Sequence, residues 1–224
     1  MYDLSVYGHL TVDRIFDGFK EHRTLGAIGN FWEGCMLTDP NLFINIQPTS
    51  IGEAIIYVDK QACTRLGRGV LNLKTKTIEQ VQSSKWNHIM YLNKIKNVDF
   101  IRDLGGTIIS ADITSGKINN IEMLKHIDYL FISDEDIFMN LKDLSKLVKG
   151  WVILHSPCGS VCHNGDEFFE TKTEIVENLN VLGAGDFFAA SFISHKLRDD
   201  REMRECVKFA HQNTTKILLR RESE

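Results

Sequence analysis

The residues with the clearest chemical potential are Gly183-Ala184-Gly185-Asp186, which run directly into the apolar stretch Phe-Phe-Ala-Ala-Ser-Phe-Ile. Glycine lets the backbone approach a ligand closely and adopt a positive φ. The first N–H groups of a helix lack partners and lie at the positive end of its dipole, so this turn suits a phosphate. Asp186 beside it can accept a proton from an attacking hydroxyl. The alternative is an ordinary helix start with a favourable acidic residue.

The second half of the chain predicts the elements that position this turn. Apolar strands and helices alternate there, with strands at 88–92, 107–111, 129–133 and 151–155 and helices at 98–104, 118–127 and up to Val148. Such alternation is typical of an α/β fold with three α/β/α layers and a mostly parallel sheet. Two antiparallel strands, at 160–163 and 168–172, are expected around Asn164-Gly165. Two closing helices are expected at 184–196 and 202–219.

The first half of the chain is less regular. It predicts a strand at 4–7 that ends at Gly8, and a helix at 30–36 that stops before Asp39-Pro40. The β-branched run at 54–58 predicts a strand, with a hairpin partner at 62–70 and a turn at 59–61. Residues 72–76 indicate no clear secondary structure.

Composition limits the class of protein. The chain has 224 residues, 43% of them apolar, and a formal charge of -4. These values predict one globular domain spanning 1–224, and they argue against disorder and against a nucleic-acid binder driven by bulk charge. No apolar run of about 18 residues is present, so we expect no membrane partner. An odd number of cysteines without a secretory signal predicts reduced thiols in the cytoplasm.

Several segments, in their order along the chain, resemble one enzyme family. NVLGAGDFFAASFI resembles the C-terminal signature of the ribokinase-like (PfkB) family of carbohydrate and nucleoside kinases, and VYGHLTVD resembles that family's opening strand and turn. Four further segments resemble family motifs in the same order, namely LGAIGN (25–30), TSIGEAIIYVD (49–59), SAD (110–112) and FISDED (131–136). The resemblance covers nearly the whole chain.

The resemblance implies a ribokinase-like fold and ATP-dependent phosphorylation of a small sugar or nucleoside, with Mg²⁺ as cofactor. It implies that Asp186 is the catalytic base and that Mg²⁺ is organised by Asp136 through water. The remaining matched residues fall into three groups: Gly183, Ala184 and Gly185 as an anion hole; Asp13, Gly26 and Asn30 for substrate hydroxyls; Ser156, Gly159 and Asn213 near the nucleotide. A monomer and a homodimer are both compatible with it.

The chain also departs from the family pattern. Leu25 replaces the first glycine of a Gly-Gly pair, Ser133 replaces an asparagine, and Ser156 replaces a glycine in the nucleotide turn. After Asp112 the family usually offers an arginine to the phosphates, whereas Lys117 is the nearest cation here. These changes support a second hypothesis, in which the protein binds a sugar or nucleoside without turnover, as a sensor or partner subunit.

The chain is shorter than is usual in this family, mainly between Leu37 and Thr49. The strands expected in 49–75 are interpreted either as a reduced lid, which would exclude water from the substrate, or as an ordinary edge hairpin. Neither reading is favoured by the residues themselves.

Other groups of residues with possible chemistry have simpler explanations. His155, Cys158, Cys162 and His163 have zinc-ligand chemistry but not the usual spacing, so buried thiols are the preferred account. Arg220-Arg221 is interpreted as solvated surface. No Walker P-loop, dinucleotide-binding or nucleophile-elbow motif is present.

Overall fold

The computed structural model describes residues 1–59, 64–116, 118, 120–177 and 179–223. The chain forms two compact units, each assembled from separate stretches of sequence. The first unit comprises Met1–Gly8, Phe43–Thr49 and Thr77–Glu174; the second comprises His9–Leu42, Ser50–Lys76 and Ile175–Glu224.

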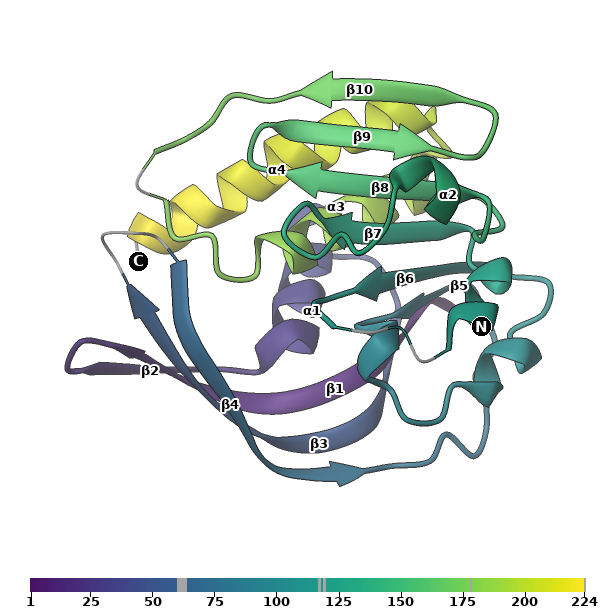
Figure 1. Cartoon of the computed structure of the whole chain (residues 1–224). Coiled ribbons are helices and arrows are strands. Elements are labelled where there is room, and N and C mark those ends of the chain that lie inside the picture. Colours follow the sequence, from purple (N-terminus) through teal and green to yellow (C-terminus); the bar gives the residue numbers. More distant parts are fainter. Residues whose placement is uncertain (60–63, 117, 119, 178, 224) are drawn as a thin grey trace. The chain divides into compact units, whose positions relative to one another are not determined.

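The first unit contains the parallel strands (Figure 1). The start of β1 (Tyr2–Asp17) pairs with β5 (Ser84–Ile89), followed in order by β6 (Ile108–Ile113), β7 (Tyr129–Ser133) and β8 (Trp151–Ser156), all parallel. β9 (Gly159–His163) and β10 (Phe168–Lys172) add to β8 as antiparallel strands. The strands predicted at 107–111, 129–133 and 151–155 and the β9–β10 hairpin are confirmed, whereas the strand expected at 88–92 lies earlier, at Ser84–Ile89. Buried apolar runs of this length favour the parallel strands.

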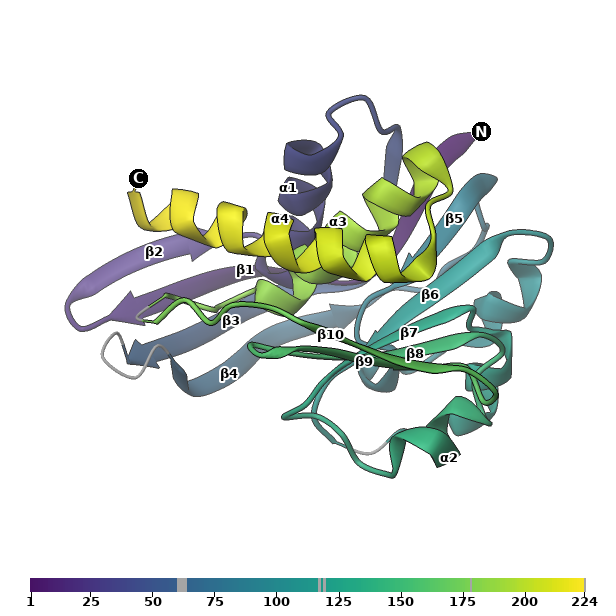
Figure 2. The ribbon, with the colours of Figure 1, turned by 90° about the horizontal axis from the view of Figure 1, so that it is seen from above.

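The connections in the first unit are shorter than predicted. The helices expected at 98–104 and 118–127 are the 3₁₀ turns η2 (Asp99–Asp103) and η3 (Ile121–His126), and η1 (Leu92–Lys94) follows β5. The stretch up to Val148 forms only α2 (Leu141–Ser145), which lies on one face of the β6–β10 strands (Figure 2). Segments of this length rarely propagate as α-helices. Their apolar side chains still join the core around Tyr7, Leu124 and Leu130.

The strands of the second unit are longer than the sequence predicts. β1 does not end at Gly8 but continues to Asp17 and forms a hairpin with β2 (Lys20–Thr24), which was not predicted. β3 (Ile44–Asp59) pairs antiparallel with β4 (Thr64–Thr75), so 72–75 is strand where none was expected. Backbone pairing with a neighbouring strand extends these strands beyond their apolar runs. The turn expected at 59–61 lies partly outside the described residues.

Three helices pack together in the second unit. They are α1 (Gly26–Thr38), α3 (Ala184–Asp199) and α4 (Met203–Ser223) (Figure 2). The two closing helices and the stop before Pro40 are confirmed, and residues 39–43 alone join α1 to β3. Leu179, Phe187, Ile217 and Leu218 form the buried cluster between α3 and α4.

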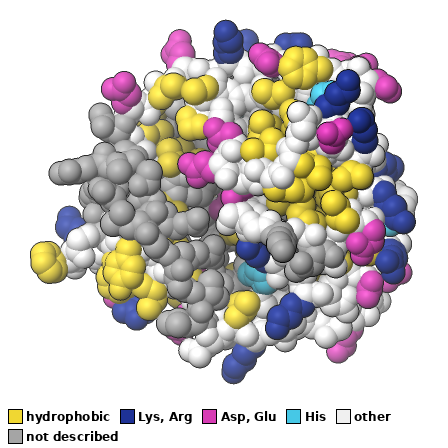
Figure 3. Space-filling view, in the orientation of Figure 1, with side chains coloured by type: hydrophobic (Ala, Val, Ile, Leu, Met, Phe, Trp, Pro, Cys, Tyr) yellow, Lys and Arg dark blue, Asp and Glu magenta, His cyan; other side chains and the backbone are white. Residues whose placement is uncertain are grey.

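On the face shown in Figure 3, basic and acidic side chains are interspersed. Within the part of the chain that the structure describes, none of the helices combines the length and apolarity needed to cross a membrane.

Candidate active site

The glycine-rich turn of the second unit is built as the first helical turn of α3. Gly183 is the N-cap residue with a left-handed φ of 84°, a conformation that favours glycine. Its carbonyl accepts the N–H of Phe187 at 3.0 Å, and the Ala184 N–H donates to the Val181 carbonyl at 2.9 Å. Of the predicted anion-hole residues, Ala184 therefore uses its N–H inside the turn. Gly185 follows in the first turn, where N–H groups have no intrahelical partner.

Asp186 is buried at the start of α3, with only 5% of its surface exposed. The Asn30 amide Nδ2 donates to its Oδ2 at 2.9 Å. A buried carboxylate costs free energy unless hydrogen bonds compensate it, so this contact stabilises the charged form. The structure thus brings the predicted base and a predicted substrate-binding residue together, although the two lie 156 positions apart in the sequence.

The meeting of Asn30 and Asp186 depends on how closely α1 crosses α3. Gly34 lies one helical turn after Asn30, and Ala190 one turn after Asp186. A Cβ at Gly34 would lie 2.8 Å from the Ala190 Cβ and 3.0 Å from Cδ1 of Phe187. Because residues i and i+4 share a helix face, the absence of a side chain at Gly34 lets the Asn30 amide reach the carboxylate.

Arg221, in the last turn of α4, joins the same cluster. Its Nη2 donates to Asn30 Oδ1 at 3.1 Å and to Glu33 Oε2 at 2.5 Å. Its guanidinium carbon lies 4.3 Å from the centre of the Phe187 ring, a cation–π distance. The interpretation of Arg221 as solvated surface is therefore wrong.

A sequence signal for Arg221 existed. Thr214, Ile217 and Leu218 are buried, and Arg221 continues the same i, i+3, i+4, i+7 face of α4. The helical period thus placed Arg221 on the packed side, whereas the neighbouring Arg220 and the acidic residues around it favoured a surface assignment.

The other predicted acceptor residues lie at the end of β1 and the start of α1. Asp13 is 5% exposed and accepts a hydrogen bond from the Thr11 hydroxyl at 2.5 Å. Gly26 packs against this pair, since a Cβ there would lie 2.4 Å from Thr11 Oγ1 and 2.9 Å from Asp13 Oδ1. Asp13, Gly26, Asn30 and Asp186 therefore all belong to the second unit.

The predicted nucleotide residues of the first unit are held in a tight turn between β8 and β9. The Ser156 hydroxyl donates to the Gly159 carbonyl at 3.1 Å and accepts the Cys158 N–H at 3.2 Å. Gly159 has a φ of 139°, and a Cβ there would lie 2.0 Å from the Thr171 carbonyl oxygen of β10. Both residues thus have a structural reason to be present.

Asn213 of α4 has its amide inside the helix packing of the second unit. Its Nδ2 donates to the hydroxyls of Thr38 on α1 at 2.9 Å and of Ser191 on α3 at 3.0 Å. These two contacts use both N–H groups of the amide. The predicted place of Asn213 near a nucleotide therefore gains no support from its contacts.

Acidic side chains gather where β6 and β7 end in the first unit. Asp136 lies half-buried in the turn after β7, and its N–H donates to the Ser133 carbonyl at 3.0 Å. Asp112, at the end of β6, contacts Nε2 of the buried His88 through Oδ2 at 3.2 Å. Its other oxygen, Oδ1, is buried without a hydrogen-bond partner among the described residues. Lys117 lies outside the described residues.

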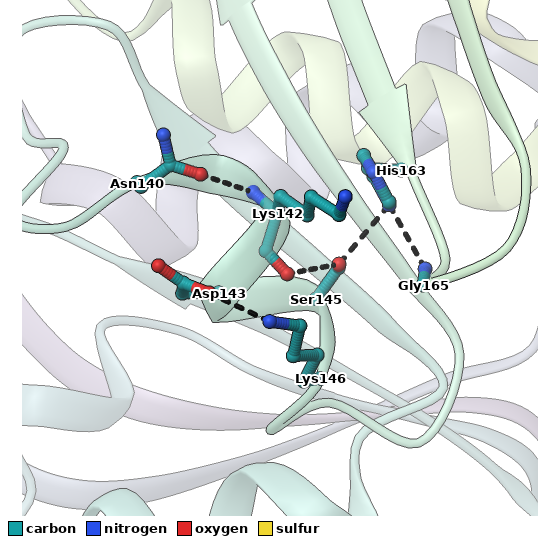
Figure 4. A network of polar contacts seen from close by, with 7 residues as sticks. All are labelled: Asn140, Lys142, Asp143, Ser145, Lys146, His163 and Gly165. Atoms are coloured by element: carbon teal, nitrogen blue, oxygen red, sulfur yellow. Dashed lines mark hydrogen bonds and ion pairs between the residues drawn. The ribbon is translucent and has the colours of Figure 1, made fainter.

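The four residues with zinc-ligand chemistry, His155, Cys158, Cys162 and His163, lie in the first unit, and His163 has a structural role there. His163 Nδ1 accepts the Gly165 N–H at 2.9 Å and lies 3.0 Å from Ser145 Oγ of α2, so the ring joins α2 to the β9 turn (Figure 4). The pKa of His155 is lowered. Burial is the largest cause of this shift, and the negative charge of Asp112 acts in the opposite direction. In the residues that are described, no cluster of three or more His, Cys, Asp or Glu side chains is arranged to hold a metal ion.

The fold matches solved structures closely. An adenosine kinase from Sinorhizobium meliloti superposes with a TM-score of 0.79 at 16% identity, covering 97% of this chain and 94% of that one. A pyrophosphate-dependent kinase in the ribokinase family gives 0.75 at 14%, with 96% and 95% covered. A ribokinase from Thermotoga maritima gives 0.71 at 15%, with 94% and 91% covered.

This chain has the ribokinase-like fold. The expected α/β class with a mostly parallel sheet is thereby confirmed. At the level of sequence, no protein-family model matches the chain, and no curated protein matches it either. The likeness therefore concerns the fold, and the chemistry must be argued from the residues themselves.

Proposed function

We propose that the protein transfers a phosphoryl group to a hydroxyl of a small sugar or nucleoside. One observation carries the proposal. The buried carboxylate of Asp186 lies in the first turn of α3, and the N-cap residue of that helix is Gly183, a glycine in the left-handed conformation. A base beside a helix N-terminus can accept the proton of a hydroxyl while the helix N–H groups hold the phosphoryl group.

In this proposal, different residues of the second unit accept the proton, stabilise charge and bind the acceptor. Asn30 holds Asp186 through Oδ2, and the Asp186 carboxylate accepts the proton of the acceptor hydroxyl. The N–H of Gly185 and the α3 dipole stabilise charge on the transferring group. Asp13, fixed by Thr11 and Gly26, binds hydroxyls of the acceptor and orients it.

Mg²⁺ fits the residues of the first unit. The orphaned Oδ1 of Asp112 is a buried carboxylate oxygen, the type of ligand that Mg²⁺ takes, and the half-buried Asp136 lies in the turn after the neighbouring strand β7. Asp136 would hold the ion through water, and the ion would neutralise phosphate charge.

ATP is the proposed donor, although the contacts of its base are less well supported. Ser156, Gly159 and Asn213 are all engaged in structural contacts. Three of the matched structures are described as a pyrophosphate-dependent kinase or a converted form of one, and one of them is complexed with a pyrophosphate analogue and myo-inositol. Pyrophosphate therefore has to be tested as a donor beside ATP.

A non-catalytic relative that binds a sugar or nucleoside is the second candidate. It is favoured by the same engagement of Ser156 and Asn213, because a protein without a nucleotide has no need of free donors there. In that case Asp13 and Asn30 would still recognise the ligand, whereas Asp186 would act only as part of the pocket.

A transfer assay separates the two candidates. Purified protein is incubated with Mg²⁺, either ATP or pyrophosphate, and a panel of hexoses, pentoses, inositols and nucleosides, and phosphorylated products are detected by mass spectrometry. Turnover on any acceptor supports the kinase. Calorimetric binding of an acceptor without turnover under either donor supports the non-catalytic relative.

The segment 49–75, which contains most of β3 and all of β4, is proposed as a lid over the acceptor, because all of it except Thr49 belongs to the same unit as Asp186. Protection of this segment from protease by a bound acceptor supports a lid, and unchanged cleavage supports an edge hairpin. A cytoplasmic location remains part of the proposal, in keeping with the free thiols at Cys35, Cys158, Cys162 and Cys206.

A further inference from the structure

The contacts of the Asn30 amide define its orientation. A guanidinium only donates hydrogen bonds and a carboxylate only accepts them. With Oδ1 toward Arg221 and Nδ2 toward Asp186, both contacts are satisfied, at 3.1 and 2.9 Å. If the amide were flipped, its oxygen would oppose the carboxylate and its NH₂ group would oppose the guanidinium. Arg221 and Asp186 therefore favour the same orientation of the amide, and Arg221 holds the amide from its Oδ1 end.

Arg221 is itself held on two sides. Glu33 lies three residues after Asn30 on α1, so the two side chains share a face and the same Nη2 contacts both. The Phe187 ring supports the guanidinium from α3. Ile217 and Leu218 pack against Phe187 from the preceding turn of α4, which fixes where the arginine begins. All three helices of the second unit thus contribute to its position.

We propose that Arg221 is a positioning residue for Asp186. Anchored by Glu33, it fixes the Asn30 amide with its NH₂ group toward Asp186 Oδ2 and thereby orients the carboxylate that accepts the proton of the acceptor hydroxyl. The effect on turnover rests on the proposed function, whereas the effect on the Asn30 amide does not. Arg221 acts through Asn30 and touches neither donor nor acceptor.

The first test needs no ligand. The side-chain amide resonances of Asn30, assigned from their loss in Asn30→Ala, are compared in the wild type, Arg221→Met and Arg221→Lys by ¹H–¹⁵N NMR. Met keeps the apolar stem without a donor, whereas Lys restores one. We expect faster solvent exchange of the Asn30 NH₂ protons and altered shifts in Arg221→Met, and recovery toward wild type in Arg221→Lys. Arg220→Met, on the exposed face of α4, is the matched control and leaves the signals unchanged.

A second variant protects the test from a folding defect. Glu33→Gln keeps the size of the anchor but removes its charge, and we expect the same change in the Asn30 signals to a smaller extent. Thermal unfolding and circular dichroism establish that each variant is folded. Wild-type Asn30 signals in a folded Arg221→Met and in a folded Glu33→Gln overturn the proposal.

The kinetic test separates positioning from direct phosphate binding. Misplacement of a reacting group by about 1 Å costs on the order of 100-fold in rate, so we expect a kcat loss of about 10- to 100-fold in Arg221→Met. The KM values of donor and acceptor should stay within about twofold. A raised donor KM with unchanged kcat overturns the proposal, because Arg221 would then bind the donor. If the wild type shows no turnover, the proposed function fails, and the NMR result alone decides the role of Arg221.

Discussion

The predicted site residues of the two units differ in the contacts that they make. In the second unit, Asp186 is hydrogen-bonded to Asn30, and Asp13 lies against Gly26 and accepts a hydrogen bond from Thr11. In the first unit, Ser156 and Gly159 are engaged in the β8–β9 turn, and Asp112 has a buried oxygen without a hydrogen-bond partner among the residues that the structure describes. The acceptor chemistry is therefore supported by geometry, whereas the donor chemistry rests on Asp112 and Asp136.

The largest expected effect lies in the second unit. Asp186→Asn removes the proton acceptor but keeps the size of the side chain, so we expect turnover to fall by at least about 100-fold. The measurement is kcat/KM with the best acceptor of the panel, with circular dichroism as the check on folding. Asp199→Asn, an aspartate at the other end of α3, is the matched control and should retain wild-type turnover. Equal rates for Asp186→Asn and the wild type would exclude the base.

A glycine of the first unit is expected to affect stability instead. In Gly159→Ala the new Cβ would meet the Thr171 carbonyl at 2.0 Å, in a backbone region that strains alanine. We expect the free energy of unfolding to fall by about 1–3 kcal/mol. Denaturant titration measures this, with Gly105→Ala as the control, because nothing lies within 4 Å of a Cβ there. A stable Gly159→Ala with a raised donor KM would instead support a direct role at the donor.

Asn213 gives a smaller effect that tests its two assignments. Asn213→Ala removes two hydrogen bonds between the helices, so we expect a loss of about 1–2 kcal/mol in the free energy of unfolding. The KM of ATP should stay within about twofold. Gln212→Ala, exposed on the same helix, serves as the control for both readings. A tenfold rise in the KM of ATP without destabilisation would restore Asn213 to the nucleotide site.

The smallest effect concerns thiol reactivity. Burial raises the pKa of Cys35 to about 12 and that of Cys206 to about 11, so at pH 8 both are protonated and poorly nucleophilic. Cys158 of the first unit is exposed. Brief treatment with iodoacetamide should alkylate Cys158 first, as followed by peptide mass spectrometry. Equally fast labelling of Cys35 would mean that the packing of α1 in the second unit opens readily.

Much of the fold could be predicted where local pattern and packing agree. β7 and the β9–β10 hairpin match their predicted ranges within a residue, because buried apolar runs and the Asn164-Gly165 turn define them locally. β1, β3 and β4 were predicted too short, since antiparallel pairing with a neighbour extends polar segments that carry no periodic signal. The 3₁₀ connections were predicted as helices because apolar spacing alone does not report the length of the turn.

Most residues of the candidate site could be named from the sequence, but their contacts could not. The glycine-rich turn identified Asp186, and the resemblance identified Asn30, yet no spacing in the sequence indicates that one donates to the other. Arg221 was missed because a charged pair near other charges is usually surface. Its place on the packed face of α4 follows from the positions of Ile217 and Leu218. That periodic signal can be used only when it is known that this face packs against α3, which is a long-range contact.

The close crossing at Gly34 also restricts how this protein can change its sequence. The space between α1 and α3 is shared by residues 34 and 190, and together they have room for one methyl group. A gain at one position should therefore be tolerated when the other loses its methyl group, as in Gly34→Ala combined with Ala190→Gly. Homologues that keep the Asn30–Asp186 pair are expected to covary at positions 34 and 190. Covariation at these two apolar positions would therefore mark sequences in which the polar site is intact.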